Sequence, residues 1–190
     1  MGLYIPPQCS EQTVSVRQLA PQADPGHFEI MTPLAWLIAF VLPACGAAGA
    51  GGLPTPALLD MSHIQRPASP NTALAAPAGT DPAPDVVTPA FPVAPPRLYD
   101  AVLAVAAEEP RTFLAAAYPA ERQAHFVARS AWFNFPDLVT AQIGDGGRET
   151  STLVLYSRSV YGRSDLGVNR RRVTEWLAAL QTKINHLSER

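Results

Sequence analysis

The sequence predicts an α+β domain, in which a small antiparallel sheet of about four strands follows one helix and a long C-terminal helix packs on one face of the sheet. Two segments place apolar residues at helical spacing, and four shorter segments between them are rich in β-branched and aromatic residues. Most of the 20 prolines lie before residue 97, so few of them can interrupt helices or strands in the region that follows. With 47% apolar and 16% charged residues, the 190-residue chain can build one core and is not a highly charged disordered protein.

Two predicted helices enclose the strand-forming segments. The first covers residues 97–108, because Pro95 and Pro96 suit the first turn of a helix and apolar residues follow at helical spacing. The second covers residues 169–186, where Asn169 can cap the amino end and the apolar residues again form one stripe. The folded domain is therefore expected to span residues 95–190.

Four segments are predicted to form the antiparallel sheet. They cover residues 112–118, 123–133, 138–143 and 152–159. The sequence Asp145-Gly146-Gly147 is typical of a hairpin turn between the last two. Short connections favour pairing of consecutive strands, so we expect a meander.

The chain before this domain begins with two segments of different character. Residues 1–30 are predicted to be a disordered leader or a mis-assigned start, with Met31 as the true first residue. Residues 31–52 form a signal-like apolar segment, because only residues 34–42 are strongly hydrophobic and a membrane-spanning helix needs about 20 apolar residues. We therefore expect export to the periplasm or membrane anchoring and association through this segment, with a cytoplasmic location as the alternative.

Cys45 ends a short sequence that resembles a bacterial lipoprotein box, Leu42-Pro43-Ala44-Cys45, although Pro43 replaces the usual small residue. Three fates are open: lipidation of Cys45, cleavage without lipidation, or an uncleaved anchor. In the plain structural interpretation, Cys45 is a small residue in an apolar stretch. Neither cysteine has partners at metal-ligand spacing, so we expect no metal site.

Residues 53–94 are predicted to be a proline- and alanine-rich linker. Proline removes backbone donors and fixes φ, which disfavours helices and central strands. Two pieces are less uniform and are candidates for docking on the domain, residues 63–71 and residues 86–91, the second as an edge strand.

An arginine-rich segment connects the last predicted strand to the final helix. Five arginines lie within fifteen residues, and three of them fall in the first turn of the helix, where the helix dipole disfavours cations. Guanidinium groups next to free amides at a helix start can bind phosphate or carboxylate groups. The predicted anion-binding residues here are Arg158, Arg163, Asn169, Arg170 and Arg171. In the alternative interpretation, Asp137 and Asp165 pair with these arginines and only stabilise the corner.

The same segment resembles a known family. Ser157-Arg-Ser-Val-Tyr-Gly-Arg-Ser-Asp-Leu-Gly-Val-Asn-Arg-Arg-Arg-Val173 is similar to the carboxyl-terminal signature of the domain of unknown function 1499 family. Ala128-Arg129-Ser130 and Phe135-Pro136-Asp137 resemble its strand ending in Arg-Ser and its Phe-Val-Asp-Asp element, although only one aspartate of that acidic pair is present. The resemblance adds Arg129 to the candidate anion-binding residues.

The resemblance extends over about residues 63–187. Ser69-Pro70-Asn71 resembles the family's Cys-Pro-x-Ser-Pro-Asn-Cys element, but Arg66 and Thr72 replace its two cysteines, so this pair can form neither a disulfide nor a metal site. Family members are mostly bacterial, often follow a membrane or export segment, and have no established reaction. The resemblance therefore implies a fold and a location rather than a mechanism.

Three functional hypotheses remain open. The first is a non-enzymatic, envelope-associated domain that holds an anionic ligand or an envelope protein at the arginine corner. The second is an enzyme for an anionic small molecule, with Asp137 or His125 as acid or base, and the third is a structural or protein-interaction module. The net charge of +4 in residues 111–190 is too small to indicate nucleic-acid binding. No phosphate loop or dinucleotide fingerprint occurs, so we expect no cofactor.

Overall fold

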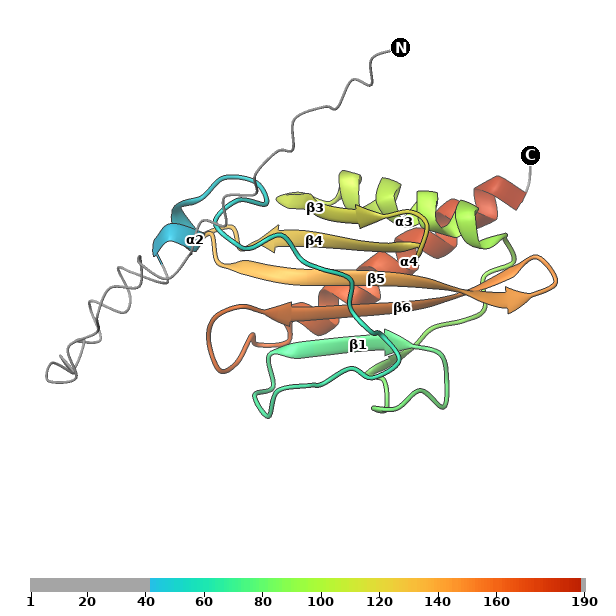
Figure 1. The fold of residues 1–190 in the computed structure, drawn as a ribbon, viewed down its shortest axis with the longest axis horizontal. Coiled ribbons are helices and arrows are strands. Elements are labelled where there is room, and N and C mark those ends of the chain that lie inside the picture. The colour runs from blue at the N-terminus through green and yellow to red at the C-terminus, as the bar shows by residue number, and fades with distance from the viewer. Residues whose placement is uncertain (1–41, 189–190) are drawn as a thin grey trace, which may run out of the picture.

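The computed structural model describes residues 42–188 and has an α+β fold, as predicted (Figure 1). The elements in chain order are α2 (Leu42–Gly46), β1 (Thr72–Ala76), β2 (Val86–Val87), α3 (Pro95–Glu108), β3 (Thr112–Tyr118), β4 (Gln123–Arg129), β5 (Pro136–Gly147), β6 (Thr150–Ser159) and α4 (Val168–Ser188). The six strands form one sheet in the order β2-β1-β6-β5-β4-β3. Both long helices, α3 and α4, cover the same face of the sheet.

The centre of the sheet is the antiparallel meander that the sequence predicts. β4, β5 and β6 pair antiparallel, and the β5–β6 hairpin keeps its register from Asp137 opposite Ser159 to Asp145 opposite Ser151. β1 pairs antiparallel with β6, whereas the short β2 pairs parallel with β1. Because side chains alternate between the faces of a strand, every second residue of β4 to β6 points away from the helices.

The core lies between the sheet and the two helices. Phe126 of β4 meets Trp176 of α4 edge to face, with ring centroids 5.4 Å apart, and both side chains are buried. This arrangement adds a favourable aromatic contact to the burial of two large side chains. Buried aliphatic residues from α3, β5, β6 and β1 complete the same cluster.

The sequence predicts a linker over residues 53–94, but this segment adds two strands to the sheet. Four of the five residues of β1 are buried, and Ala73 and Ala75 pack in the core. Phe91 is also buried and exchanges two backbone hydrogen bonds of 2.9 Å with Ser151. The linker prediction is wrong for residues 72–76, because the prolines flank β1 without interrupting it and Thr72 is its one β-branched residue, so its local propensity for a strand is weak. β2 lies within residues 86–91, the candidate edge strand, and forms the edge of the sheet. The sheet consequently has six strands instead of about four.

Residues 53–64, which we call the strap, cross the face of the sheet opposite the helices (Figure 1). The side chain of Gln123 binds the strap through both backbone groups of Leu59, accepting from its N–H and donating to its carbonyl at 2.8 Å each. The hydroxyl of Tyr118 donates to the carbonyl of Pro56 at 2.8 Å. These bonds attach the strap to β3 and β4.

The predictions for residues 1–30 and for residues 31–41 of the signal-like segment lie outside the described residues. None of the helices within residues 42–188 combines the length and the apolar character that crossing a membrane requires.

Candidate functional site

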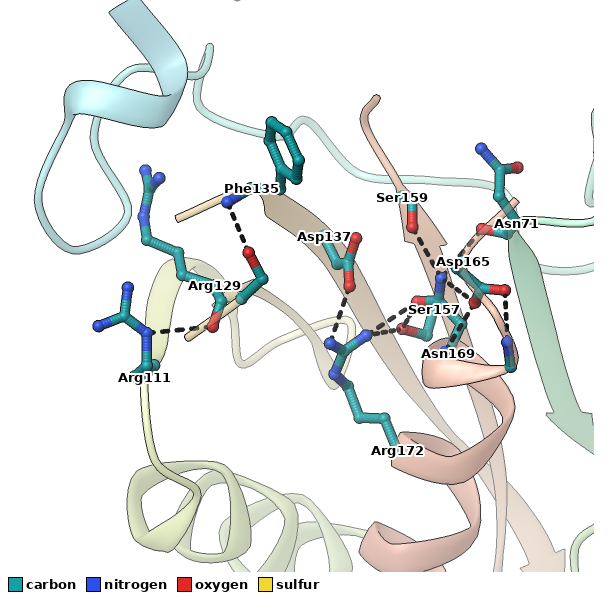
Figure 2. Close-up of polar contacts among 12 residues, drawn as sticks. Asn71, Arg111, Arg129, Phe135, Asp137, Ser157, Ser159, Asp165, Asn169 and Arg172 are labelled. Atoms are coloured by element: carbon teal, nitrogen blue, oxygen red, sulfur yellow. Dashed lines mark hydrogen bonds and ion pairs between the residues drawn. The ribbon is translucent and has the colours of Figure 1, made fainter. Parts of the chain in front are cut away.

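The corner between β6 and α4 is organised around Asn169, whose side chain is fully buried (Figure 2). Its amide nitrogen lies 3.0 Å from the carbonyl oxygen of Asn71, 3.0 Å from the hydroxyl of Ser159 and 2.7 Å from Asp165. Its amide oxygen accepts a hydrogen bond from Ser157 at 2.5 Å. Asn169 therefore joins the helix start to β6 and to the segment before β1, and it has no face left for a ligand.

Arg172 supplies the internal ion pair of this corner. Its guanidinium lies 2.8 Å from the carboxylate of Asp137, and both side chains are largely buried. The same guanidinium donates to the side-chain oxygens of Asn169 and Ser157 at 2.8 and 3.0 Å. Figure 2 shows Arg172 pointing from α4 toward the start of β5, where these partners converge. The pairing predicted for Asp137 is thus made with Arg172, which was not among the candidate anion-binding residues.

Asp165 contacts backbone groups and Asn169 instead of an arginine. Its carboxylate accepts hydrogen bonds from the backbone N–H groups of Gly167 and Asn169 at 3.0 and 2.8 Å. These hydrogen bonds lower the pKa of Asp165, although burial acts against them as the largest single influence. A carboxylate at the start of α4 also opposes the unfavourable effect of the nearby arginines on the helix dipole.

The remaining predicted arginines of the corner do not converge. Arg163 and Arg170 are exposed, and Arg171 makes only an exposed contact of 3.9 Å with Glu175 on its own helix. Such an exposed pair contributes little to stability. Arg158, in contrast, lines two cavities on the strap side of the sheet.

Arg129 is buried at the end of β4, where it binds backbone carbonyls of α2 and of the segment after it. Its guanidinium donates to Gly49, Gly51 and Ala44 at 2.6, 2.6 and 2.8 Å, and to Asn134 at 3.1 Å. Burial lowers the pKa of Arg129. With its donors directed at carbonyl groups, Arg129 fixes residues 44–51 to the domain and is not open to an anion.

Cys45 lies beside this contact. Burial raises the pKa of its thiol, and the positive charge of Arg129 acts in the opposite direction. The lipidation proposed for Cys45 stays a prediction.

A cavity of about 370 Å³ lies between the strap and the sheet. Its polar lining consists of Thr55 from the strap and His125, Thr140 and Arg158 from three neighbouring strands. The rest of the lining is aliphatic or proline: Leu53, Pro54, Pro56, Ala57, Leu59, Leu138, Val139 and Val160. The lining has no acidic residue, and Arg158 has no ion-pair partner within residues 42–188.

His125 is the buried polar group of this cavity. Its Nδ1 lies 3.0 Å from the hydroxyl of Thr140, and its ring meets that of Tyr118 edge to face. Its Nε2 is buried and has no hydrogen-bond partner in the described part of the chain. Burial lowers the pKa of His125, which favours the neutral ring at pH 7. A buried polar atom without a partner is costly and is typical of functional sites.

A second groove, of about 810 Å³, begins on the other side of Arg158. Its other basic groups are already paired: Arg66 lies 2.8 Å from Asp85, and His63 lies 2.9 Å from Asp60. Arg66 also donates to the hydroxyl of Thr72 at 3.2 and 3.3 Å. Arg66 and Thr72 stand where the family pattern has cysteines, so a hydrogen bond connects these two positions in this chain.

A comparison with known families assigns most of this domain. Residues 64–180 match the family described as "Protein of unknown function (DUF1499)". The match spans more than half of the chain, and the protein belongs to this family. A comparison with curated proteins finds no match.

Sequence reasoning missed several residues of the site. The contact between Arg172 and Asn169 could have been predicted, because Arg172 lies three residues after Asn169 and therefore on the same face of the helix. Nothing in the sequence points to the roles of Gln123, Tyr118 and Thr140. Those roles depend on the strap, which the sequence predicts to be an unattached linker.

Proposed function

We propose that this protein binds a small molecule with an apolar body and one anionic head group, in the cavity between the strap and the sheet. The single observation that carries the proposal is Arg158, a cation without an acidic partner in the described residues, at the edge of a mainly aliphatic cavity. The role of anion binding thus belongs to Arg158 and not to the whole arginine corner.

The size and lining of the cavity support this class of ligand. Small-molecule sites commonly enclose about 300–1,000 Å³ and are mostly apolar, with a few polar groups that orient the ligand. The aliphatic and proline side chains would cover the body of the ligand, and the guanidinium of Arg158 would bind a carboxylate or a phosphate.

His125 supplies a second donor in this arrangement. When the hydroxyl of Thr140 donates to Nδ1, the neutral ring carries its proton on Nε2. The Nε2 proton, which has no partner within residues 42–188, would then donate to the head group of the ligand. Ligand binding would thereby satisfy a buried polar atom.

The enzyme hypothesis loses one of its two candidate residues. Asp137 is occupied by Arg172 and lies outside the lining of the cavity. Of the two candidates, His125 is the one that remains in the cavity as a possible acid or base, so we propose ligand binding as the function. The corner around Asn169 then serves to hold β6 and α4 in place.

The proposal is tested with four compounds that separate charge from apolar body. Octanoate and octyl phosphate carry both, octanol carries only the body, and inorganic phosphate carries only the charge. Either octanoate or octyl phosphate should raise the melting temperature of the full chain more than octanol and inorganic phosphate do, and the preferred head group identifies the ligand class.

The matched variants are Arg158→Gln and Arg163→Gln, since both arginines are exposed but only Arg158 lines the cavity. R158Q should remove the advantage of the anionic compounds over octanol, and R163Q should keep it. If neither anionic compound exceeds octanol in the unmodified chain, or if R163Q removes the advantage equally, the proposal is wrong.

We further propose that the protein is exported and works in the cell envelope, because of the signal-like segment before residue 53. Mass spectrometry of the mature amino terminus tests this location and the fate of Cys45. Cleavage near Cys45 would support export, and an intact residue 1 on a protein recovered from the cytoplasm would contradict it.

A further inference from the structure

The connection between β4 and β5 presents a cluster of exposed aromatic side chains. Trp132 is 92% exposed, Phe133 is 71% exposed and Phe135 is 42% exposed. The rings of Phe133 and Phe135 stack with centroids 5.5 Å apart. Single exposed apolar residues are ordinary, but three aromatic residues within four positions indicate a surface that a partner covers.

The connection is held in a fixed shape by polar contacts. The N–H of Ser130 donates to the carbonyl of Phe135, and the hydroxyl of Ser130 accepts from the N–H of Phe135, both at 2.9 Å. Asn134 adopts a left-handed backbone conformation with φ of 55°, and its carbonyl accepts from Arg129. The aromatic side chains are thus displayed by a supported loop, which lowers the entropy cost of binding.

The aromatic loop is tied to the start of the described chain. The side-chain nitrogen of Asn134 donates to the carbonyls of Cys45 and Ala47. α2 therefore lies beside the loop (Figure 1), and the strongly hydrophobic residues 34–42 lead directly into this helix in the sequence. The start of the described chain and the exposed aromatic side chains consequently lie at the same end of the sheet.

A second connection at the same end adds an exposed leucine and positive charge. β5 begins and β6 ends at this end of the sheet, where Asp137 pairs with Ser159. Leu166, in the connection from β6 to α4, is 92% exposed. Arg163 in the same connection and Arg170 after it are exposed and have no ion-pair partner within residues 42–188.

From these observations we propose that this end of the sheet docks on a lipid bilayer. Trp132, Phe133 and Leu166 enter the interface between head groups and acyl chains, and Arg163 and Arg170 lie near anionic head groups. Tryptophan and other amphipathic or apolar side chains flanked by arginine are typical of membrane interfaces. Trp132, Phe133, Leu166, Arg163 and Arg170 are not among the residues that line the cavity under the strap, so this surface uses other residues than the proposed ligand site.

Tryptophan fluorescence tests the depth of the docking surface directly. Of the three tryptophans, Trp176 is buried and Trp36 lies before the described residues, so Trp36→Phe leaves Trp132 as the exposed reporter. With vesicles of phosphatidylcholine and phosphatidylglycerol, the full-length W36F chain should show a blue shift, and lipids with brominated chains should quench the emission. A chain that binds vesicles while Trp132 stays unquenched would overturn the proposal; this is also the result expected if a protein covers the surface.

Substitutions in the loop provide an independent measurement in the full chain. Trp132→Ala and Phe133→Ala should each lower the vesicle partition coefficient about tenfold, because each removes a large apolar side chain from the interface. Val87→Ala is the matched control, since Val87 is also exposed but pairs with Ala76, at the end of β1 that lies away from the start of β5 and the end of β6. Equal partitioning of W132A, F133A and V87A would contradict the proposal, and unchanged melting temperatures would show that all three variants fold.

Discussion

Arg172 shows how one residue connects distant parts of this chain. It lies one helical turn after Asn169, and together they contact the start of β5, the end of β6 and the segment before β1. The sequence presents Arg170, Arg171 and Arg172 as three equal cations. Only helical geometry separates them, because residues three positions apart lie on the same face whereas neighbours do not.

The first prediction concerns this ion pair. Arg172→Leu leaves the largely buried carboxylate of Asp137 without its cation, which should lower the free energy of unfolding by about 3 kcal/mol. Arg171→Leu, a neighbour whose contact with Glu175 is exposed, should change it by less than about 1 kcal/mol. Urea denaturation measures both, and equal losses in the two variants would show that the corner does not depend on this pair.

His125 leads to a prediction about pH. Burial lowers its pKa in the folded protein, whereas an unfolded histidine has a pKa of about 6.5. Below this value the unfolded chain binds a proton that the folded chain does not, so stability falls as the pH decreases from 7.5 toward 5.5.

The measurement is the free energy of unfolding against pH for the wild type and for His125→Gln. Carboxylates contribute to both proteins, so the difference between the two curves isolates the histidine. The wild type should lose more stability than H125Q on acidification. Parallel curves would mean that the imidazole is free to take up a proton in the folded state.

At the scale of elements, the sequence predicted α3, β3 and α4 closely and β1 not at all. Regular apolar spacing and flanking prolines define the two helices. β1 has the sequence Thr-Ala-Leu-Ala-Ala, which has little intrinsic preference for a strand. Its place in the sheet comes from pairing with β6 and from packing against α4. Such tertiary contacts override local propensity and are invisible in a single sequence.

This difference predicts where the folding unit begins. A chain of residues 42–190 should unfold cooperatively, whereas residues 95–190 should not fold, because β6 would have an unpaired edge and Asn169 would lose its partner Asn71. Circular dichroism melts of the two chains measure this. A cooperative transition of similar midpoint in the shorter chain would contradict this prediction and would show that the folded domain begins at residue 95, as the proline-rich composition before it suggests.

At the scale of the whole molecule, the strap closes one side of the cavity in which we propose that a ligand binds. The cavity is lined by residues from the strap, β4, β5 and β6, which are far apart in sequence. The sequence predicted that arginines near the start of the last helix bind an anion, and Arg158 was one of these candidate residues. The sequence could not show that Arg158 is the arginine of this group that lines the cavity. That depends on which side chains lie on the strap side of the sheet and which lie at the start of α4.

The most direct test of the account is to map the ligand contact by NMR. The side-chain nitrogen signals of His125 and Arg158 are followed during titration of the full chain with octanoate, and with octyl phosphate in parallel. The preferred compound should shift the Nε2 signal of His125 and the Nε signal of Arg158 in a saturable manner, and should leave the Nε signals of Arg163 and Arg170 unchanged. Saturable shifts confined to Arg163 and Arg170, or no saturable shift at His125 and Arg158 with either compound, would contradict the account.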